Sequence, residues 1–203
     1  MTGTATTHAA ITEEDRLRAD LYGFLSALLA APPDRALLDK TAALTGDASP
    51  LGRAIAALAT LAAAATPVSA EREFTRLFIG LGRGELLPYA SYYLTGFLNE
   101  KPLMLLRRDM PALGLARSES VYEPEDNIAS MMEMMAGQID GRFGTSRPLA
   151  RQREFFNRHL APWAGHFFTD LETAKGSVFY APVGTIGREF MTIEREAFRL
   201  MGT

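Results

Sequence analysis

Imidazole side chains are the first groups in this sequence that could do chemistry, because they bind metal ions and transfer protons near neutral pH. They occur at His8, His159 and His166. His8 stands close to the N-terminus, and Pro162 separates the other two histidines. Two histidines without a third ligand make a weak pattern for a metal site. We therefore interpret His159 and His166 as partly exposed helix residues, and we expect no bound metal.

Gly80, Gly82 and Gly84 suggest a phosphate-binding loop by composition. A P-loop ends in Lys-Ser or Lys-Thr, and a dinucleotide-binding loop follows a strand. Neither feature accompanies these glycines. We interpret the segment as a loop that needs positive φ angles or a close approach of the backbone.

Nucleophiles are scarce as well. The chain has no cysteine, which excludes disulfides, thiol nucleophiles and thiolate metal sites. No serine stands in a G-x-S-x-G context. Carboxylates are plentiful, but no pair has the apolar flanks that predict a shifted pKa. We expect a protein that is not an enzyme, with no catalytic residue and no cofactor.

Charge and hydropathy exclude further classes of protein. The net charge of −3 and the isoelectric point near 5.7 argue against a general nucleic-acid binder, which needs a basic face. Residues 1–10 lack the basic and apolar regions of a secretory signal. The Ala-rich segment 54–65 is too short to span a bilayer. We expect a soluble, cytoplasmic protein with no nucleic-acid partner and no stable membrane insertion.

Apolar residues recur at three- and four-residue steps along most of the chain, which predicts helices throughout. The first helix should follow an N-cap at Thr12 and end before Pro32-Pro33. No stretch alternates long enough for a strand, so we predict an all-α fold, a single-domain helical bundle. We place a flexible N-terminal tail at residues 1–11 and the helical domain at residues 12–203. Further helices are expected near 34–44, from Ser49-Pro50, from Ser69, over Tyr92 to Phe97, between Pro102 and Pro111, over 128–139, from Pro148 with a break at Pro162, and over 186–201.

Four methionines in five residues form the most unusual apolar segment, at Met131, Met132, Met134 and Met135. One interpretation is a core stripe at helical spacing, although four such residues cannot all share one face. The other is a groove for an apolar peptide, because the unbranched, polarizable side chain adapts to varied partners.

The segment around these methionines is acidic. Within this stretch the only basic residue is Arg117. The acidic residues are Glu119, Glu123, Glu125, Asp126 and Glu133. They form either a solvated face or a docking site in which arginines of a basic partner pair with carboxylates. An adaptable groove with an acidic rim would suit a peptide that has arginines followed by an apolar run.

Three motifs carry a resemblance to a known family. They are Glu73-Phe-Thr-Arg-Leu-Phe-Ile-Gly80, Leu87-Pro-Tyr-Ala-Ser-Tyr-Tyr93 and Glu123-Pro-Glu-Asp-Asn-Ile-Ala129. Together with the later segments 155–163, 167–171 and Phe179-Tyr180, they resemble the TorD/DmsD/NarJ family of redox-enzyme maturation chaperones. The resemblance covers residues 16–201, nearly the whole chain.

The resemblance implies an all-helical, TorD-like cytoplasmic chaperone. Such a chaperone binds the twin-arginine signal peptide of a molybdenum-cofactor oxidoreductase, and often its apo form, and delays export until the cofactor is inserted. The implied client is of the formate dehydrogenase or DMSO/TMAO reductase type, and the sequence leaves open whether the chaperone forms a homodimer. The signal-peptide-binding residues that the resemblance implies are Leu77, Phe78, Pro88, Tyr89, Ser91, Tyr92, Glu123, Asp126 and Asn127.

One position departs from the family pattern. The family usually has Asp-His in the third motif, whereas this chain has Asp126-Asn127. Asparagine keeps hydrogen-bonding ability but cannot take up a proton near neutral pH as imidazole does. Two other functions stay open: a non-catalytic scaffold subunit of an oxidoreductase complex, and a small helical hydrolase that rests only on the abundant carboxylates and the two C-terminal histidines.

Overall fold

The computed structural model describes residues 11–116 and 123–201. Over these residues the chain forms helices and no β-strand, apart from an isolated bridge between Tyr89 and Asn127. The predicted all-α fold is confirmed. The division into a tail at 1–11 and a domain at 12–203 remains a prediction, because residues 1–10 lie outside the described part. The helical elements are α1 (Glu13–Ala30), α2 (Arg35–Ala42), α3 (Pro50–Ala64), α4 (Pro67–Phe74), η1 (Thr75–Ile79), α5 (Ala90–Thr95), α6 (Lys101–Asp109), η2 (Met110–Leu113), α7 (Ile128–Asp140), α8 (Leu149–Phe155), η3 (Phe156–Leu160), α9 (Ala164–Thr173) and α10 (Tyr180–Leu200).

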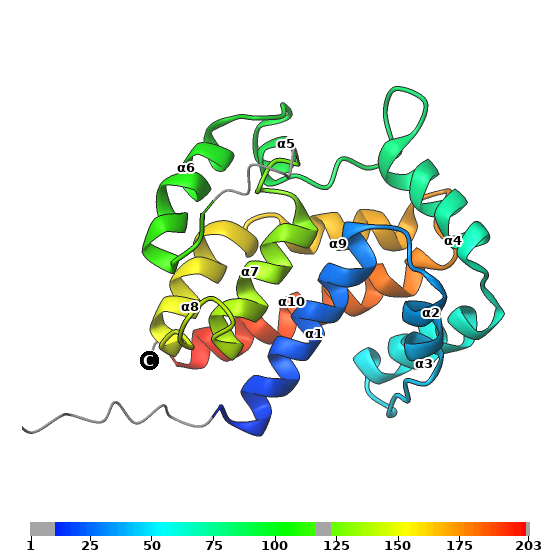
Figure 1. Cartoon of the computed structure of the whole chain (residues 1–203), viewed down its shortest axis with the longest axis horizontal. Coiled ribbons are helices and arrows are strands. Elements are labelled where there is room, and N and C mark those ends of the chain that lie inside the picture. The colour runs from blue at the N-terminus through cyan, green and yellow to red at the C-terminus, as the bar shows by residue number, and fades with distance from the viewer. Residues whose placement is uncertain (1–10, 117–122, 202–203) are drawn as a thin grey trace, which may run out of the picture.

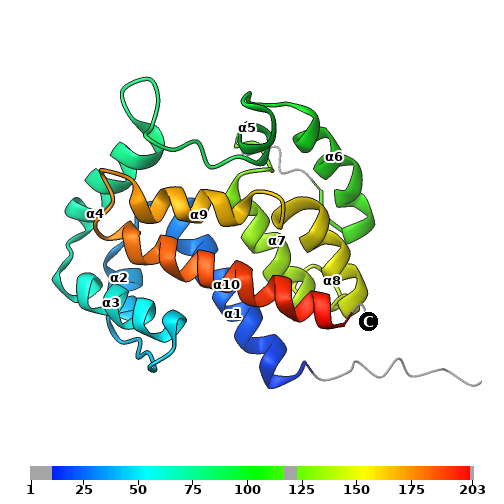
Figure 2. The ribbon, with the colours of Figure 1, turned by 180° about the vertical axis from the view of Figure 1, so that it is seen from behind.

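Four long helices form the centre of the bundle. Helix α1 crosses the front of the molecule in Figure 1, and α10 crosses the front in the reverse view of Figure 2. Helix α7 packs along α1, and α9 packs along α10. At one end α3 packs on both α10 and α2, while α6 and α8 lie at the other end.

Large apolar side chains from these central helices fill the core. Tyr22 of α1, Phe168 of α9 and Ile186 of α10 are fully buried. Helices α9 and α10 can approach closely because α10 has glycine where they meet. A Cβ at Gly187 would overlap the ring of Phe168, and one at Gly184 would overlap the backbone of α9. A larger residue at either position would force the two helices apart.

Local caps start the first helices as expected. The side chain of Thr12 accepts a hydrogen bond from Asp15 N, and that of Ser49 accepts one from Gly52 N. The expected start at Ser69 is wrong, because α4 begins at Pro67. Thr66 is its N-cap, and the side chains of Thr66 and Ser69 each accept a bond from the other residue's backbone N–H. This reciprocal capping box makes Ser69 the third residue of the helix.

The helix predicted over Tyr92 to Phe97 begins and ends two residues earlier than expected. Helix α5 ends at Thr95, because Gly96 adopts a left-handed conformation with φ of 83°. A glycine in this conformation is a common helix stop. Phe97 therefore lies beyond the helix, with 69% of its surface exposed.

Helix α10 has no side-chain cap of its own at Phe179. The cap comes instead from Glu73 at the end of α4. Its buried carboxylate accepts hydrogen bonds from the backbone N–H groups of Val178, Phe179 and Tyr180, at 2.7, 3.1 and 2.9 Å. These groups have no partner within the helix. One side chain thus satisfies the start of a helix more than 100 residues away.

A second buried carboxylate joins α10 to α1. Glu194 accepts two hydrogen bonds from Arg18, at 2.7 and 2.8 Å, and a third from the hydroxyl of Tyr22. Burial lowers the pKa of Arg18, but the bond and the charge of Glu194 outweigh it and raise the pKa above its ordinary value. The guanidinium therefore stays charged and the pair is fully hydrogen-bonded, as a buried ion pair requires.

The methionines of α7 belong to the core. Met131, Met132, Met134 and Met135 are all buried. Helix α7 packs along α1 on one side and contacts α8 and η3 on another. A helix that is covered on several sides can bury apolar residues around most of its circumference. Of the two interpretations of these four methionines, the core stripe is therefore the one that the structure supports.

Among the described residues, no single helix is long and apolar enough to cross a membrane. The two consecutive segments Pro50–Ala64 and Pro67–Ile79 reach that length and composition only together, with a bend of 119° between them.

Replacing Glu73 by Gln tests the long-range cap of α10. The amide cannot accept through its nitrogen and lacks the charge, so we expect the free energy of unfolding to fall by about 2 kcal/mol. Urea denaturation measures this loss. Glu71→Gln, at an exposed position of the same helix, is the control and should change stability by about 0.5 kcal/mol or less. Equal losses in the two variants would contradict the capping role.

Candidate functional site

The second and third motifs lie side by side. Ala90 N donates to Asp126 O at 3.0 Å, and Ile128 N donates to Pro88 O at 2.8 Å. These two bonds form the isolated antiparallel bridge between Tyr89 and Asn127. The bridge therefore joins the start of α5 to the start of α7.

Asp126 holds this junction together from inside. Its Oδ2 accepts hydrogen bonds from the backbone N–H of Ser91, at 2.8 Å, and from the hydroxyl of Ser91, at 2.5 Å. Only 1% of Asp126 is exposed. Helix α5 has no side-chain cap from Tyr89, so Asp126 caps it from a distant segment. Its other oxygen, Oδ1, has no hydrogen-bond partner among the described residues.

Asn127 is the N-cap of α7. Its Oδ1 accepts from Ala129 N at 2.9 Å, and its Nδ2 donates to Oε1 of Glu123 at 3.2 Å. Asparagine is among the best N-cap residues. The amide that departs from the family pattern therefore suits two tasks at once: it starts α7 and orients Glu123.

Tyr89 orients the same carboxylate. Its hydroxyl donates to Oε1 of Glu123. Burial of the ring and the bond to Glu123 raise the pKa of Tyr89 well above its ordinary value of 10. The hydroxyl therefore keeps its proton at neutral pH and acts as a donor. Glu123 itself is exposed, so a carboxylate with a fixed direction stands at the surface.

A cavity of about 340 Å³ opens beside this carboxylate. Aromatic packing builds its floor: the ring of Phe78 meets Phe74 edge-on at 4.9 Å and Tyr180 at 5.5 Å. Glu123 and Glu133, both exposed, stand among the lining residues. We call this space the leader cavity, after the signal peptide, or leader, whose binding the family resemblance predicts. It is lined by Ser26, Leu29, Ala30, Phe74, Phe78, Ile79, Pro88, Tyr89, Glu123, Asn127, Ala129, Ser130 and Glu133.

The predicted binding residues divide into three groups. Five of them line the leader cavity: Phe78, Pro88, Tyr89, Glu123 and Asn127. Leu77, Ser91 and Asp126 are buried and do not line it. Tyr92 also lies outside the lining, where its hydroxyl accepts from Arg83 at 2.6 Å and its ring faces the same guanidinium at 5.2 Å.

Sequence reasoning missed the contribution of α1 to the cavity. Ser26, Leu29 and Ala30 line it from the last turns of that helix. Leu29 is one of the apolar residues of the predicted first helix, so its type alone suggested a core residue. Glu133 was part of the predicted acidic set, and this was the signal in the sequence that could have placed it at the cavity.

Only part of the acidic segment forms a rim of the leader cavity. Glu123 and Glu133 line the leader cavity, whereas buried Glu125 accepts a bond from Arg107 at 2.8 Å. Arg117 and Glu119 lie outside the described residues.

The glycine-rich loop behaves as predicted. Gly80 and Gly82 have φ angles of 62° and 92°, which favour glycine. At Gly84 a Cβ would collide with the backbone of Leu77 and Phe78. The loop ends η1 and keeps Phe78 at the cavity.

The two C-terminal histidines differ from each other. His166 is exposed, but His159 is buried, so the prediction that both are partly exposed is wrong for His159. Its Nε2 lies 3.1 Å from Oδ2 of Asp109 on α6. Burial lowers the pKa of His159 despite the opposing effect of Asp109, so the ring is neutral at pH 7 and Nε2–H donates to the carboxylate. No group of three or more metal-binding side chains occurs in the described ranges.

Residues 45–169 match the family described as nitrate reductase delta subunit. The chain belongs to this family. The chaperone protein TorD of Vibrio cholerae serotype O1 is 33% identical over 102 residues, which cover 47% of this chain and 46% of that protein. The match thus spans about half of this relative. The chaperone protein TorD of Aliivibrio salmonicida is 28% identical over 189 residues, 82% of this chain and 87% of that protein.

Solved structures add evidence on the fold of this family member. The crystal structure of "a putative redox enzyme maturation protein" from Archaeoglobus fulgidus matches with a TM-score of 0.58 and 21% identity, over 93% of this chain and 99% of that chain. It shows that the two chains share a fold. The names of the curated relatives are those of chaperones, which agrees with the expectation that this chain is not an enzyme.

His159 should make stability depend on pH. Its folded pKa lies below the ordinary 6.5, so below about pH 6.5 the unfolded chain binds more protons than the folded chain. The free energy of unfolding should therefore fall as the pH is lowered from about 7 to 5. His159→Gln should flatten this decrease, as measured by urea denaturation at several pH values. His166→Gln removes an exposed histidine and is the control. If the free energy of unfolding of the His159 variant falls with decreasing pH as steeply as that of the wild type, His159 is not the source of this pH dependence.

Proposed function

We propose that this chain is a cytoplasmic chaperone that binds the twin-arginine leader peptide of a molybdenum-cofactor oxidoreductase. In this role it delays export of the apo form until the cofactor is inserted. The observation that carries the proposal is the leader cavity, in which an apolar floor lies next to oriented surface carboxylates. Membership of the family and the chaperone names of the relatives support it.

The chemistry of the leader cavity fits both parts of such a leader. An apolar side chain of the leader would contact Phe78 and Leu29, which lie on the floor. Tyr89 and Asn127 both donate to Oε1 of Glu123. The second oxygen of Glu123 accepts no bond from the described residues, so it is available to a guanidinium. Arginine offers a planar fork that matches a carboxylate better than lysine does.

The buried members of the predicted set would act by positioning. In this structure Asp126 satisfies the start of α5 and does not reach the surface. Leu77 and Ser91 are likewise inside. We infer that Glu123 meets a leader arginine directly, whereas Asp126 keeps α5 and α7 together.

The client follows from this role. It is an exported enzyme of the formate dehydrogenase or DMSO/TMAO reductase type, and the leader must be bound before it crosses the membrane, hence in the cytoplasm.

A scaffold subunit is the second candidate, favoured by exposed apolar residues around α5 and α6. Leu94, Phe97, Leu98 and Met104 are all at least 43% exposed. A permanent subunit would cover such side chains in the finished complex. Co-purification with the mature enzyme separates the two: a subunit remains at equal stoichiometry, whereas a chaperone is released.

Calorimetric titration with a synthetic twin-arginine leader tests the proposal. The leader should bind more tightly than a scrambled peptide, and replacement of both arginines by lysine should weaken binding. Phe78→Ala should weaken it about tenfold or more, because a buried aromatic contact is lost. Glu123→Gln should have a similar effect, because a charged hydrogen bond is lost.

The control is Phe97→Ala, which removes an exposed aromatic side chain outside the leader cavity. It should bind the leader as the wild type does. If the leader binds no better than the scrambled peptide, or if both Phe variants weaken binding equally, the assignment of this cavity fails.

A further inference from the structure

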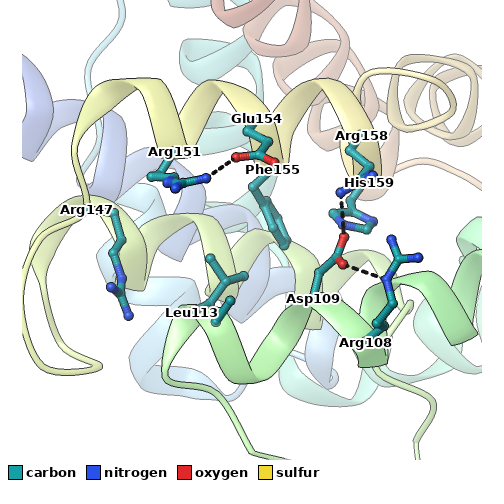
Figure 3. A pocket seen from close by; sticks show the side chains of 10 residues that line it. Arg108, Asp109, Leu113, Arg147, Arg151, Glu154, Phe155, Arg158 and His159 are labelled. Atoms are coloured by element: carbon teal, nitrogen blue, oxygen red, sulfur yellow. Dashed lines mark hydrogen bonds and ion pairs between the residues drawn. The ribbon is translucent and has the colours of Figure 1, made fainter.

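Arginines gather around a second cavity, of about 370 Å³, at the end of the bundle formed by α6 and α8. It lies between the end of α6 with η2 and the segment from residue 147 to η3 (Figure 3). We call it the arginine cavity. It shares no lining residue with the leader cavity. A volume of this size lies in the range of pockets that hold small molecules, about 300–1,000 Å³.

The lining has an excess of positive charge. Four guanidinium groups, those of Arg108, Arg147, Arg151 and Arg158, face the carboxylates of Asp109 and Glu154. Since His159 is neutral at pH 7, the excess amounts to two charges. The whole chain has a net charge of −3, so this local excess runs against the overall balance. A dianion would neutralise it.

Arg147 is held in place by its backbone, while its side chain has no hydrogen-bond or ion-pair partner among the described residues. Its N–H donates to Gln138 O at 2.7 Å, and its carbonyl accepts from Gln152 Nε2 at 2.9 Å. The guanidinium lies against Gly114, where a Cβ would stand only 3.3 Å from Nη2. No carboxylate in the described ranges pairs with it. Its five N–H donors can therefore all serve a ligand.

The opposite end of the arginine cavity is prearranged by Asp109. This carboxylate accepts bonds from Arg108, Arg158 and His159, each at 3.1 Å. Burial opposes its ionisation, but the bonds from Arg108 and His159 and the nearby arginine charges lower the pKa of Asp109. One carboxylate thus fixes two arginines and leaves that end with a positive charge.

Figure 3 shows how the charged groups are divided. Arg147 and Arg151 lie toward one end, Arg108 and Arg158 toward the other, and Leu113 lies between them. Each end has one positive charge in excess, because Arg151 pairs with Glu154 at 2.7 Å and Asp109 serves both arginines at the other end. The arrangement matches a ligand with two negative groups.

We propose that the arginine cavity binds a small polyanion with two linked negative groups, phosphoryl or carboxylate. Arginine recognises both groups through paired N–H donors. Arg147 is the main anchor, since its side chain has no competing acceptor among the described residues. Arg108, Arg151 and Arg158 complete the site. Each of them either gives up its ion pair with Asp109 or Glu154 or contacts the ligand and that carboxylate together.

Calorimetry with inorganic pyrophosphate tests the proposal, with citrate as the carboxylate arm. The full chain at low ionic strength should bind at least one of them at one site per chain. Tighter binding of pyrophosphate would assign a phosphoryl ligand, and tighter binding of citrate a carboxylate ligand. Arg147→Gln should weaken the binding at least about tenfold, because a charged hydrogen-bonding partner is lost. Added salt should also weaken it.

The matched control is Arg72→Gln, which removes the same charge from an exposed position of α4, outside the lining of either cavity. It should bind pyrophosphate as the wild type does. Failure of both anions to bind, or equal weakening in the two variants, would overturn the proposal. Leader binding is measured on the same Arg147 variant. The affinity of this variant for the leader should equal that of the wild type. The anion titration thus tests this site, whereas the leader titration tests the proposed function.

Discussion

The start of α10 depends on a carboxylate from another part of the chain. A helix begins with several backbone N–H groups that have no partner within the helix, and α10 has no local side chain to serve them. Glu73 accepts three bonds there, and the hydroxyl of Tyr180 then donates to Leu28 O on α1. Through these contacts α4, α10 and α1 meet at one point, next to the floor of the leader cavity.

The same device recurs at two other places in the described chain. Asp126 caps α5, and Glu85 accepts from the backbone of Lys175 and Gly176 ahead of α10. A six-residue helix such as α5 is not stable alone in water, so a tertiary cap is what holds it. Burying a carboxylate is unfavourable unless its oxygens are bonded. Three N–H donors offset that cost at Glu73, and the N–H and hydroxyl of Ser91 reduce it at Asp126.

This device explains how far the sequence could be interpreted. Caps made by neighbouring residues, such as Thr12 and Ser49, follow a short pattern and were predicted. Thr66 shows the limit of such patterns, because both Thr66 and Ser69 are good cap residues. The capping box that they form makes Thr66 the N-cap of α4. Caps from distant residues have no local pattern, so Asp126 suggested an arginine partner when its role in the structure is to hold α5.

The two cavities show the same limit. The floor of the leader cavity was partly predictable, because Phe78 and Tyr89 lie in recognisable motifs. Leu29 of α1 also lines this cavity, and only the packing of α1 on α7 brings it there. The arginine cavity was not predicted at all. Its four arginines are spread over residues 108–158 without forming a basic run. Only the tertiary structure brings them together, and Asp109 at the end of α6 bonds to Arg158 and His159 of η3 there.

Helix α7 connects the two cavities. Its N-cap, Asn127, lines the leader cavity, and the carbonyl of Gln138 in its last turn holds the backbone of Arg147. A moving helix in this position would couple the two sites. However, α7 is buried along most of its length, and closely packed interiors resist small displacements. We therefore expect the helix to act as a rigid spacer, so that the proposed leader and the proposed anion would bind independently of each other.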